Sequence, residues 1–236
     1  MDLTVVSIFV NPSQFGPNED FSKYPRTLDA DTRVLIEEDV DFLFLPSVDQ
    51  IYPKGFSTNI QIGPISLLFE GAIRPGHFDG VATVVSILFN IVQPNIAFFG
   101  QKDAQQLAVI KKLVRDLAFP IEIVACATIR DKDGLALSSR NRYLSENERI
   151  EAHALSKTIF LTKDLLLKGK SPSEAKTASE IEFHLLAPNA ALDYLEIVDS
   201  ETFQPISSFE SMARLDATII IAAHIGATRL IDNILL

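Results

Sequence analysis

Short unbroken runs of hydrophobic residues mark the first half of the chain. The run over residues 3–10 is apolar apart from Thr4 and Ser7, and Asn11-Pro12 ends it. Runs of four to eight apolar residues bounded by turn signals are typical of strands that are covered on both faces of a parallel sheet. The same pattern predicts further strands over residues 41–45, 96–99 and 121–129.

Longer segments between these runs repeat their apolar residues at helical spacing. They predict helices over residues 27–39, 79–92 and 103–117. In the first helix we expect Leu28, Leu35 and Ile36 to face inward. A short edge strand over residues 56–62 and a helical turn over residues 65–69 complete this part. Strands that alternate with helices indicate βαβ units and a parallel sheet, hence an α/β fold.

The pattern changes near Arg130. A polar loop leads into two predicted helices over residues 145–168 and 171–186, and Ser145 with Glu148 fits a capping box at the first helix start. Strands over residues 192–198 and 217–223 and a final segment over residues 228–236 follow. The sequence therefore predicts two domains, a larger α/β domain over residues 1–129 and a smaller α+β domain over residues 130–236.

Composition narrows the class of protein. Of the 236 residues, 47% are apolar and 22% are charged, as in soluble globular proteins. The formal net charge of −10 disfavours non-specific binding to nucleic acid or to a membrane surface. The single cysteine, Cys126, lies in an apolar run, so we expect a buried strand thiol and no disulfide. A signal peptide and an apolar stretch of the ~20 residues that span a bilayer are both missing, so a cytoplasmic location is expected.

Two clusters of polar residues follow predicted strands, where open α/β sheets bind their ligands. Asn11 and Gln14 offer neutral amides to a polar small molecule, although a simple strand-ending turn is the favoured interpretation of this cluster alone. Gly100 and Lys102 stand between a strand and a helix start, an arrangement that suits a phosphate. The alternative is that Asp103 caps the helix while Lys102 is solvated, and the two interpretations are about even.

Two further clusters lie in loops. Ser138, Ser139 and Arg140 could grip phosphate oxygens, or they could form a capped turn with an exposed arginine. Arg74 and His77 lie in a loop rich in proline and glycine; His77 could be a base or a ligand donor, but a structural histidine that holds the loop is favoured. No set of Asp, Glu and His has transition-metal spacing, so no metal ligand is predicted.

Taken in order along the chain, these clusters resemble the pantothenate synthetases (pantoate–β-alanine ligases). The stretches that carry the resemblance are FVNPSQF (9–15), YPRTL (24–28), LFEGAIRPGHFDGVATVV (68–85), FFGQKDAQQL (98–107), DGLALSSRN (133–141) and RLIDN (229–233). The resemblance implies a Rossmann-like fold of the nucleotidyltransferase type. It also implies an ATP-dependent enzyme that converts pantoate to pantoyl adenylate and transfers the pantoyl group to β-alanine.

The resemblance further implies the residues of the site. Gln14 and Gln106 would hold pantoate, and Mg²⁺ would assist with the phosphates. The catalytic residues would be Lys102, Ser138, Ser139 and Arg140. The ATP site would consist of Gly100, Gln101, Lys102, Asp103, Ile129, Leu137, Ser138, Ser139 and Arg140. A homodimer formed through the first domain is also implied.

Family members begin with a further strand and helix that carry a His-x-Gly-His signature, and this sequence starts after that segment. We therefore expect the 236 residues to be inactive alone. A second hypothesis is a catalytically dead nucleotide- or metabolite-binding module of the same fold. A third is another adenylate-forming ligase, against which Gln14 and Gln106 argue for pantoate.

Overall fold

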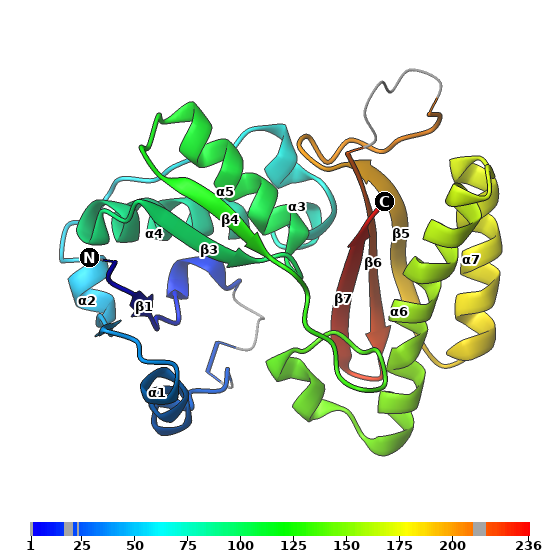
Figure 1. Ribbon diagram of the computed structural model, residues 1–236, viewed down its shortest axis with the longest axis horizontal. Helices are drawn as coiled ribbons and strands as arrows, with labels where there is room; N and C mark the ends of the chain where they lie inside the picture. The colour runs from blue at the N-terminus through cyan, green and yellow to red at the C-terminus, as the bar shows by residue number, and fades with distance from the viewer. Residues whose placement is uncertain (1, 17–20, 23, 210–215) are drawn as a thin grey trace. The chain divides into compact units, whose positions relative to one another are not determined.

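The computed structural model describes residues 2–16, 21–22, 24–209 and 216–236 (Figure 1). Its contacts divide the chain into two compact units, unit 1 with Met1–Asn95 and Leu117–Ile121, and unit 2 with Ile96–Asp116 and Glu122–Leu236. The predicted domain boundary after Ile129 stays a prediction. In chain order the elements are β1 (Val5–Ser7), η1 (Pro12–Gln14), α1 (Leu28–Glu37), β2 (Phe42–Phe44), α2 (Val48–Ile51), η2 (Pro64–Leu67), α3 (Phe69–Ile73), α4 (His77–Val92), β3 (Ile96–Gly100), α5 (Ala104–Asp116), β4 (Glu122–Cys126), η3 (Ser139–Tyr143), α6 (Glu146–Leu167), α7 (Pro172–Leu186), β5 (Ala191–Asp199), β6 (Ala217–Ile225) and β7 (Thr228–Leu235).

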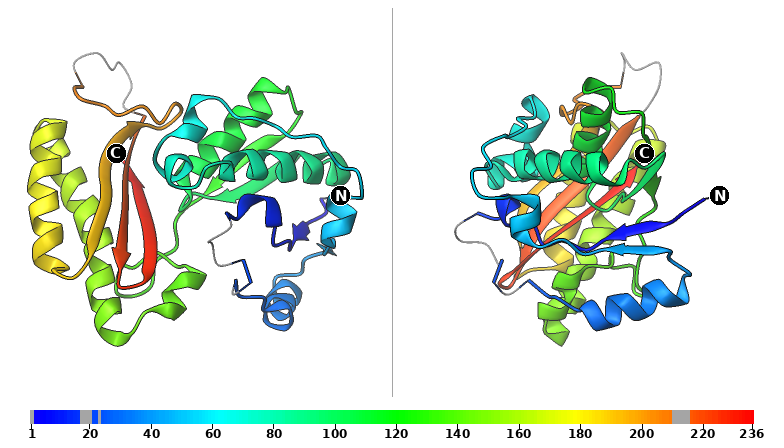
Figure 2. Two further views of the ribbon diagram at one scale, coloured as in Figure 1. Left: turned by 180° about the vertical axis from the view of Figure 1, so that it is seen from behind. Right: turned by 90° about the vertical axis from the view of Figure 1, so that its left-hand side faces the viewer.

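Unit 1 is built around α4 and a pair of parallel strands. Val6 of β1 pairs with Leu43 of β2, and the right-hand view of Figure 2 shows the two strands side by side. α4 buries most of its residues, and η1 packs against it. The helices predicted over residues 27–39 and 79–92 are confirmed.

Two expectations for unit 1 were wrong. Residues 56–62 form no strand, because the Ile60 N–H donates to Thr83 Oγ1 (3.0 Å) and the Ile62 N–H to Asp79 Oδ1 (3.0 Å). These two backbone N–H groups are thus bound to side chains of α4 and cannot form the hydrogen bonds of a strand pair. Leu28 and Ile36 of α1 do not face inward but are 40% and 70% exposed, and α1 buries no residue fully.

Unit 2 joins a βαβ motif to an antiparallel sheet. β3 and β4 are parallel, with Phe98 opposite Val124, and α5 connects them and packs on both. The sheet has the order β5-β6-β7, and α6 and α7 cover one of its faces (Figure 1). Ser145 and Glu148 form the predicted capping box at the start of α6.

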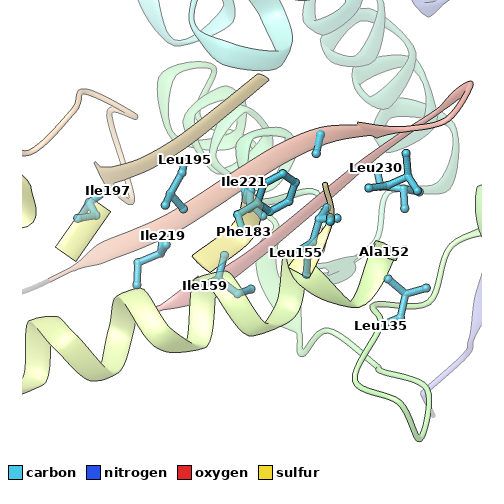
Figure 3. Packing of buried hydrophobic residues seen from close by; sticks show 14 of the residues in the cluster. Leu135, Ala152, Leu155, Ile159, Phe183, Leu195, Ile197, Ile219, Ile221 and Leu230 are labelled. Carbon is cyan, nitrogen blue, oxygen red and sulfur yellow. The ribbon is translucent and has the colours of Figure 1, made fainter. Parts of the chain in front are cut away.

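The main hydrophobic core lies between that sheet and its two helices. Figure 3 shows Leu155 and Ile159 of α6 directed at the sheet, where Ile219 and Ile221 of β6 meet them beside Phe183 of α7. None of these five side chains is more than 1% exposed. Because a fully buried side chain of this size contributes about 1.5–3 kcal/mol, this core anchors unit 2.

The parallel strands are less covered than the sequence predicts. β3 alternates between exposed and half-buried residues, and Phe98 is 66% exposed. Cys126 at the end of β4 is exposed, so the prediction of a buried thiol was wrong. Alternation of this kind is typical of a sheet with one covered face. The α/β fold class is nonetheless confirmed, with parallel strand pairs, helices and a small antiparallel sheet. None of the helices in the described ranges is long and apolar enough to cross a membrane.

Candidate active site

The turn between β3 and α5 carries four of the residues predicted to bind ATP. The Gln101 N–H donates to the carbonyl oxygen of Cys126 (2.8 Å), which ties the turn to the end of β4. A β-carbon placed on Gly100 would meet no heavy atom within 4 Å, so the space beside this backbone is open. Lys102 is half-buried, and α5 begins two residues later. An open backbone ahead of a helix N-terminus is the local geometry that binds phosphate oxygens.

The same turn is held from β7. The side-chain amide of Asn233 donates to the carbonyl oxygens of Gln101 (3.0 Å) and Lys102 (2.6 Å). Asn233 is 3% exposed. Asn233 was not among the residues predicted to form the site, although the polar pair Asp232-Asn233 stands between the apolar pairs Leu230-Ile231 and Ile234-Leu235.

A short hairpin brings two of the predicted nucleotide contacts together. The Leu137 N–H donates to the Ile129 carbonyl oxygen (2.9 Å), and Arg130 forms an antiparallel bridge with Ala136. Gly134 closes the turn with a φ of +88°, which L-residues with a side chain rarely adopt. Ile129 and Leu137 are 70% and 47% exposed, so both apolar side chains are open to a ligand.

A charged cluster fixes the tip of this hairpin. Asp133 accepts from the Leu135 N–H (3.1 Å) and from Arg149 of α6 (2.7 Å), and His153 Nε2 lies 3.0 Å from it. Burial alone would raise the pKa of Asp133, but these hydrogen bonds and the His153 charge outweigh it and lower the pKa to about 2. The Asp133 carboxylate therefore stays ionised and keeps the hairpin attached to α6.

The hairpin leads directly into the predicted phosphate-binding segment. Ser138 caps η3, and its Oγ accepts from the Arg140 N–H (3.3 Å). The side chain of Asn141 donates to the Ala136 carbonyl oxygen (3.0 Å). Ser138, Ser139 and Arg140 are all half-buried. The capped turn proposed as the alternative for this cluster is present, but Arg140 is half-buried and not exposed as that alternative expects.

In unit 1, the end of β1 positions Gln14. Asn11 caps η1 and is 2% exposed; its side-chain nitrogen donates to Gln14 Oε1 (3.2 Å) and to the Gly80 carbonyl oxygen (3.1 Å). Tyr52 donates to Asn11 Oδ1 (2.8 Å). Burial raises the pKa of the Tyr52 phenol and so favours this donating form, although its hydrogen bonds to Ser13 and Asn11 act in the opposite direction. The Gln14 amide is therefore oriented by a buried network.

His77 acts as the structural residue that the sequence analysis favoured. Its Nδ1 lies 2.8 Å from the Gln14 carbonyl oxygen, so it is the nitrogen that carries the proton. Arg74 donates to His77 Nε2 (3.1 Å) and to the same carbonyl oxygen (3.3 Å). The start of α4 thus holds the backbone of Gln14, while Asn11 orients its side chain.

The predicted residues divide between the units. Gln14 lies in unit 1, while the residues from Gly100 to Asp103, Gln106, Ile129 and the segment from Leu137 to Arg140 lie in unit 2. Gln106 is a half-buried residue in the first turn of α5. Within the described ranges, no group of three or more His, Cys, Asp or Glu residues could hold a metal ion.

Comparison with known proteins gives a consistent result. The family model described as pantoate-beta-alanine ligase matches residues 1–235. The chain is 47% identical over its whole length to a pantothenate synthetase of Pseudothermotoga lettingae, and 50% identical over 99% of its length to one of Caldicellulosiruptor saccharolyticus. It covers 82% of each of these two relatives.

Solved structures agree with the sequence relatives. The crystal structure of pantothenate synthetase from Thermus thermophilus superposes with a TM-score of 0.93 at 48% identity, over 98% of this chain and 83% of that one. The pantoate-beta-alanine ligase of Francisella tularensis, solved in complex with beta-gamma ATP and beta-alanine, gives a TM-score of 0.75 at 36% identity. That match covers 99% of this chain and 79% of the other.

Proposed function

Because the chain belongs to the pantoate-beta-alanine ligase family, we propose that it joins pantoate to β-alanine through a pantoyl adenylate, at the expense of ATP. It is an ATP-dependent ligase, and the products are pantothenate, AMP and pyrophosphate. A pantoate carboxylate oxygen attacks the α-phosphorus of ATP, and pyrophosphate leaves. The amine of β-alanine then attacks the acyl carbon, AMP leaves, and the nitrogen gives up a proton to water.

Unit 2 supplies the residues proposed to bind ATP. They are Gly100, Gln101, Lys102, Asp103, Ile129, Leu137, Ser138, Ser139 and Arg140. The observation that carries this assignment is the open turn before α5, where Gly100 leaves the backbone accessible next to Lys102. The hydrogen bond between Leu137 and Ile129 supports it, because it presents both proposed nucleotide contacts from one hairpin.

The chemistry asks for charge and position rather than for a protein nucleophile. Attack at the α-phosphorus builds negative charge on the phosphate oxygens. Lys102 and Arg140 are proposed to neutralise that charge, and the hydroxyls of Ser138 and Ser139 to donate hydrogen bonds to it.

Pantoate is proposed to be held by the amides of Gln14 and Gln106, which can both donate and accept. For Gln14 the support is the buried Asn11 network that fixes its side chain. Mg²⁺ is proposed to arrive bound to the ATP phosphates, because protein sites usually bind Mg²⁺ largely through substrate phosphates and water. A homodimer and a cytoplasmic location, where ATP is available, complete the proposal.

The two half-reactions test this function separately. ATP, Mg²⁺ and pantoate without β-alanine should release pyrophosphate to the extent of one equivalent per site, and addition of β-alanine should then give pantothenate and AMP. Binding of ATP with no pyrophosphate release would instead support either a nucleotide-binding module or the expectation that the 236 residues are inactive alone. Light scattering of the same sample would test the homodimer.

A further inference from the structure

Two adjacent polar residues, Asp232 and Asn233, occupy buried positions of the strand β7. Asp232 and Asn233 are each 3% exposed. Burial of polar groups costs free energy unless they are hydrogen-bonded, so such residues need partners. Their partners are in the two segments that carry the proposed ATP-binding residues.

Asn233 grips the peptide on each side of Lys102. Its amide donates to the carbonyl oxygen of Gln101, which belongs to the peptide before Lys102, and to that of Lys102, which belongs to the peptide after it. Fixing both flanking peptide planes fixes the direction of the Cα–Cβ bond between them. The amide of Asn233 therefore determines where the Lys102 side chain starts.

The same contact also orients backbone donors. In a trans peptide the N–H points away from the C=O, and the described chain has no cis peptide. With the carbonyls of Gln101 and Lys102 turned toward Asn233, the N–H groups of Lys102 and Asp103 point to the opposite side. Two successive N–H groups that point the same way ahead of a helix suit an anion.

Asp232 makes the equivalent connection to the hairpin. Its carboxylate accepts from both terminal nitrogens of Arg130 (2.6 and 2.9 Å), and Arg130 also donates to the carbonyl oxygens of Gly134 (3.1 Å) and Asn233 (3.3 Å). The Asn233 N–H donates to Asp232 Oδ1 (2.8 Å). One dipeptide of β7 thus holds both the Lys102 turn and the hairpin that leads to Arg140.

We propose that Asn233 is a positioning residue of the ligase, which aims Lys102 and the N–H groups beside it at the ATP phosphates, while Asp232 holds the hairpin in the same frame through Arg130. The proposal rests on the proposed ATP site. Asn233 acts through Lys102 and does not itself touch the substrate.

Hydrogen exchange tests the positioning without any assay of activity. In Asn233→Ala, amides of residues 100–107 should exchange at least tenfold faster than in the unaltered protein, while amides of α7 should be unchanged. In Asn233→Ser, the hydroxyl can donate to one of the two carbonyl oxygens, so amides of residues 100–107 should exchange at a rate between those of Asn233→Ala and the unaltered protein. This variant serves as the test if Asn233→Ala does not fold. Asn189→Ala removes an exposed amide that donates to Glu151 and is the matched control.

ATP binding and kinetics test the consequence. The dissociation constant for ATP, measured by calorimetry, should rise about tenfold in Asn233→Ala and less in Asn233→Ser, and the KM for β-alanine should not change. Unchanged exchange at residues 100–107, or faster exchange spread over all of unit 2, would overturn the positioning role. Absence of ATP binding by the unaltered protein would instead overturn the proposed function. The hydrogen-exchange result would then still show whether Asn233 fixes the backbone around Lys102.

Discussion

The side chain of Asn11 donates to the carbonyl oxygen of Gly80, and this contact depends on the absence of a side chain at Gly80. A β-carbon there would lie 2.6 Å from the carbonyl oxygen of Ser13. The close approach lets α4 hold η1, and with it Gln14.

Gly80→Ala should therefore destabilise the protein. Alanine in a helix interior gains up to about 1 kcal/mol over glycine, but overpacking against a backbone oxygen costs about 1–3 kcal/mol, so the clash outweighs the gain. Urea unfolding should show a lower free energy of unfolding. Calorimetric titration should show weaker pantoate binding. The control is Gly100→Ala, which meets no atom and should leave the unfolding free energy nearly unchanged. A more stable Gly80→Ala variant would contradict the packing argument.

Lys102→Ala should nearly abolish formation of pantoyl adenylate. The lost contact is charge-assisted and is made mainly in the transition state, so its removal should cost about 3–4 kcal/mol, as for loss of an oxyanion donor. Pyrophosphate release in a quenched single turnover measures it. Lys112→Ala, which breaks an exposed pair with Asp116, is the matched control. An unaltered rate in Lys102→Ala would refute the role.

Gln106→Ala should weaken pantoate binding much more than ATP binding. A neutral amide in the first turn of α5 can pair with the hydroxyl and carboxylate groups of pantoate. Calorimetric titration of the variant with pantoate and with ATP measures the two losses of affinity. Gln204→Ala, an exposed glutamine of the same unit, should affect neither, and equal losses for both ligands in Gln106→Ala would contradict the assignment.

Stability should depend on pH through Asp133. Its pKa is lowered from 3.8 to about 2 in the folded protein, so its contribution is complete above the unfolded value and disappears as the pH falls from about 4 to 2. Asp133→Asn should therefore be less stable than the unaltered protein at pH 6, with a difference that shrinks toward pH 2. Urea unfolding across this range measures it, with Asp164→Asn, in an exposed pair with Lys168, as control. A difference that does not change with pH would exclude this linkage.

Features encoded by neighbouring residues could be predicted from the sequence. Ser145 and Glu148 are three residues apart and form the capping box that their spacing predicts. The stripe of apolar residues on α5 likewise identified a helix whose Leu107, Ile110 and Leu113 are buried. These signals involve residues only a few positions apart, so they can be recognised without knowledge of the rest of the fold.

Features that depend on distant residues could not be predicted. The donors of Ile60 and Ile62 bind side chains of a helix about 20 residues further on, which the strand-like pattern of residues 56–62 does not reveal. Asn233 finds its acceptors 131 and 132 residues away. The sequence identified the RLIDN stretch that contains Asn233, but only the structure gives that asparagine a partner.

Variants of the ion pair between Arg130 and Asp232 allow its effect on stability to be measured apart from its effect on ATP binding. The Asp232 side chain is 2% exposed, and that of Arg130 is 18% exposed and packs over Phe160. Arg130→Ala leaves a buried carboxylate without its partner and should cost about 3–5 kcal/mol of unfolding free energy. Asp232→Ala should cost less, because Arg130 can turn toward water. The double change should cost less than the sum of the two.

Replacing the pair by apolar residues of similar size tests what the pair is for. In Arg130→Met with Asp232→Leu, stability should return to within about 1 kcal/mol of the unaltered protein, because apolar packing avoids the desolvation of two charges. The hydrogen bonds from Arg130 to the carbonyl oxygens of Gly134 and Asn233 remain lost, however. Amides of residues 129–141 should therefore still exchange faster, and ATP should still bind more weakly, despite the recovered stability. If ATP affinity recovered together with stability, the hydrogen bonds of Arg130 would not be needed for ATP binding. The Arg130–Asp232 pair would then contribute only packing, and the positioning role would be refuted.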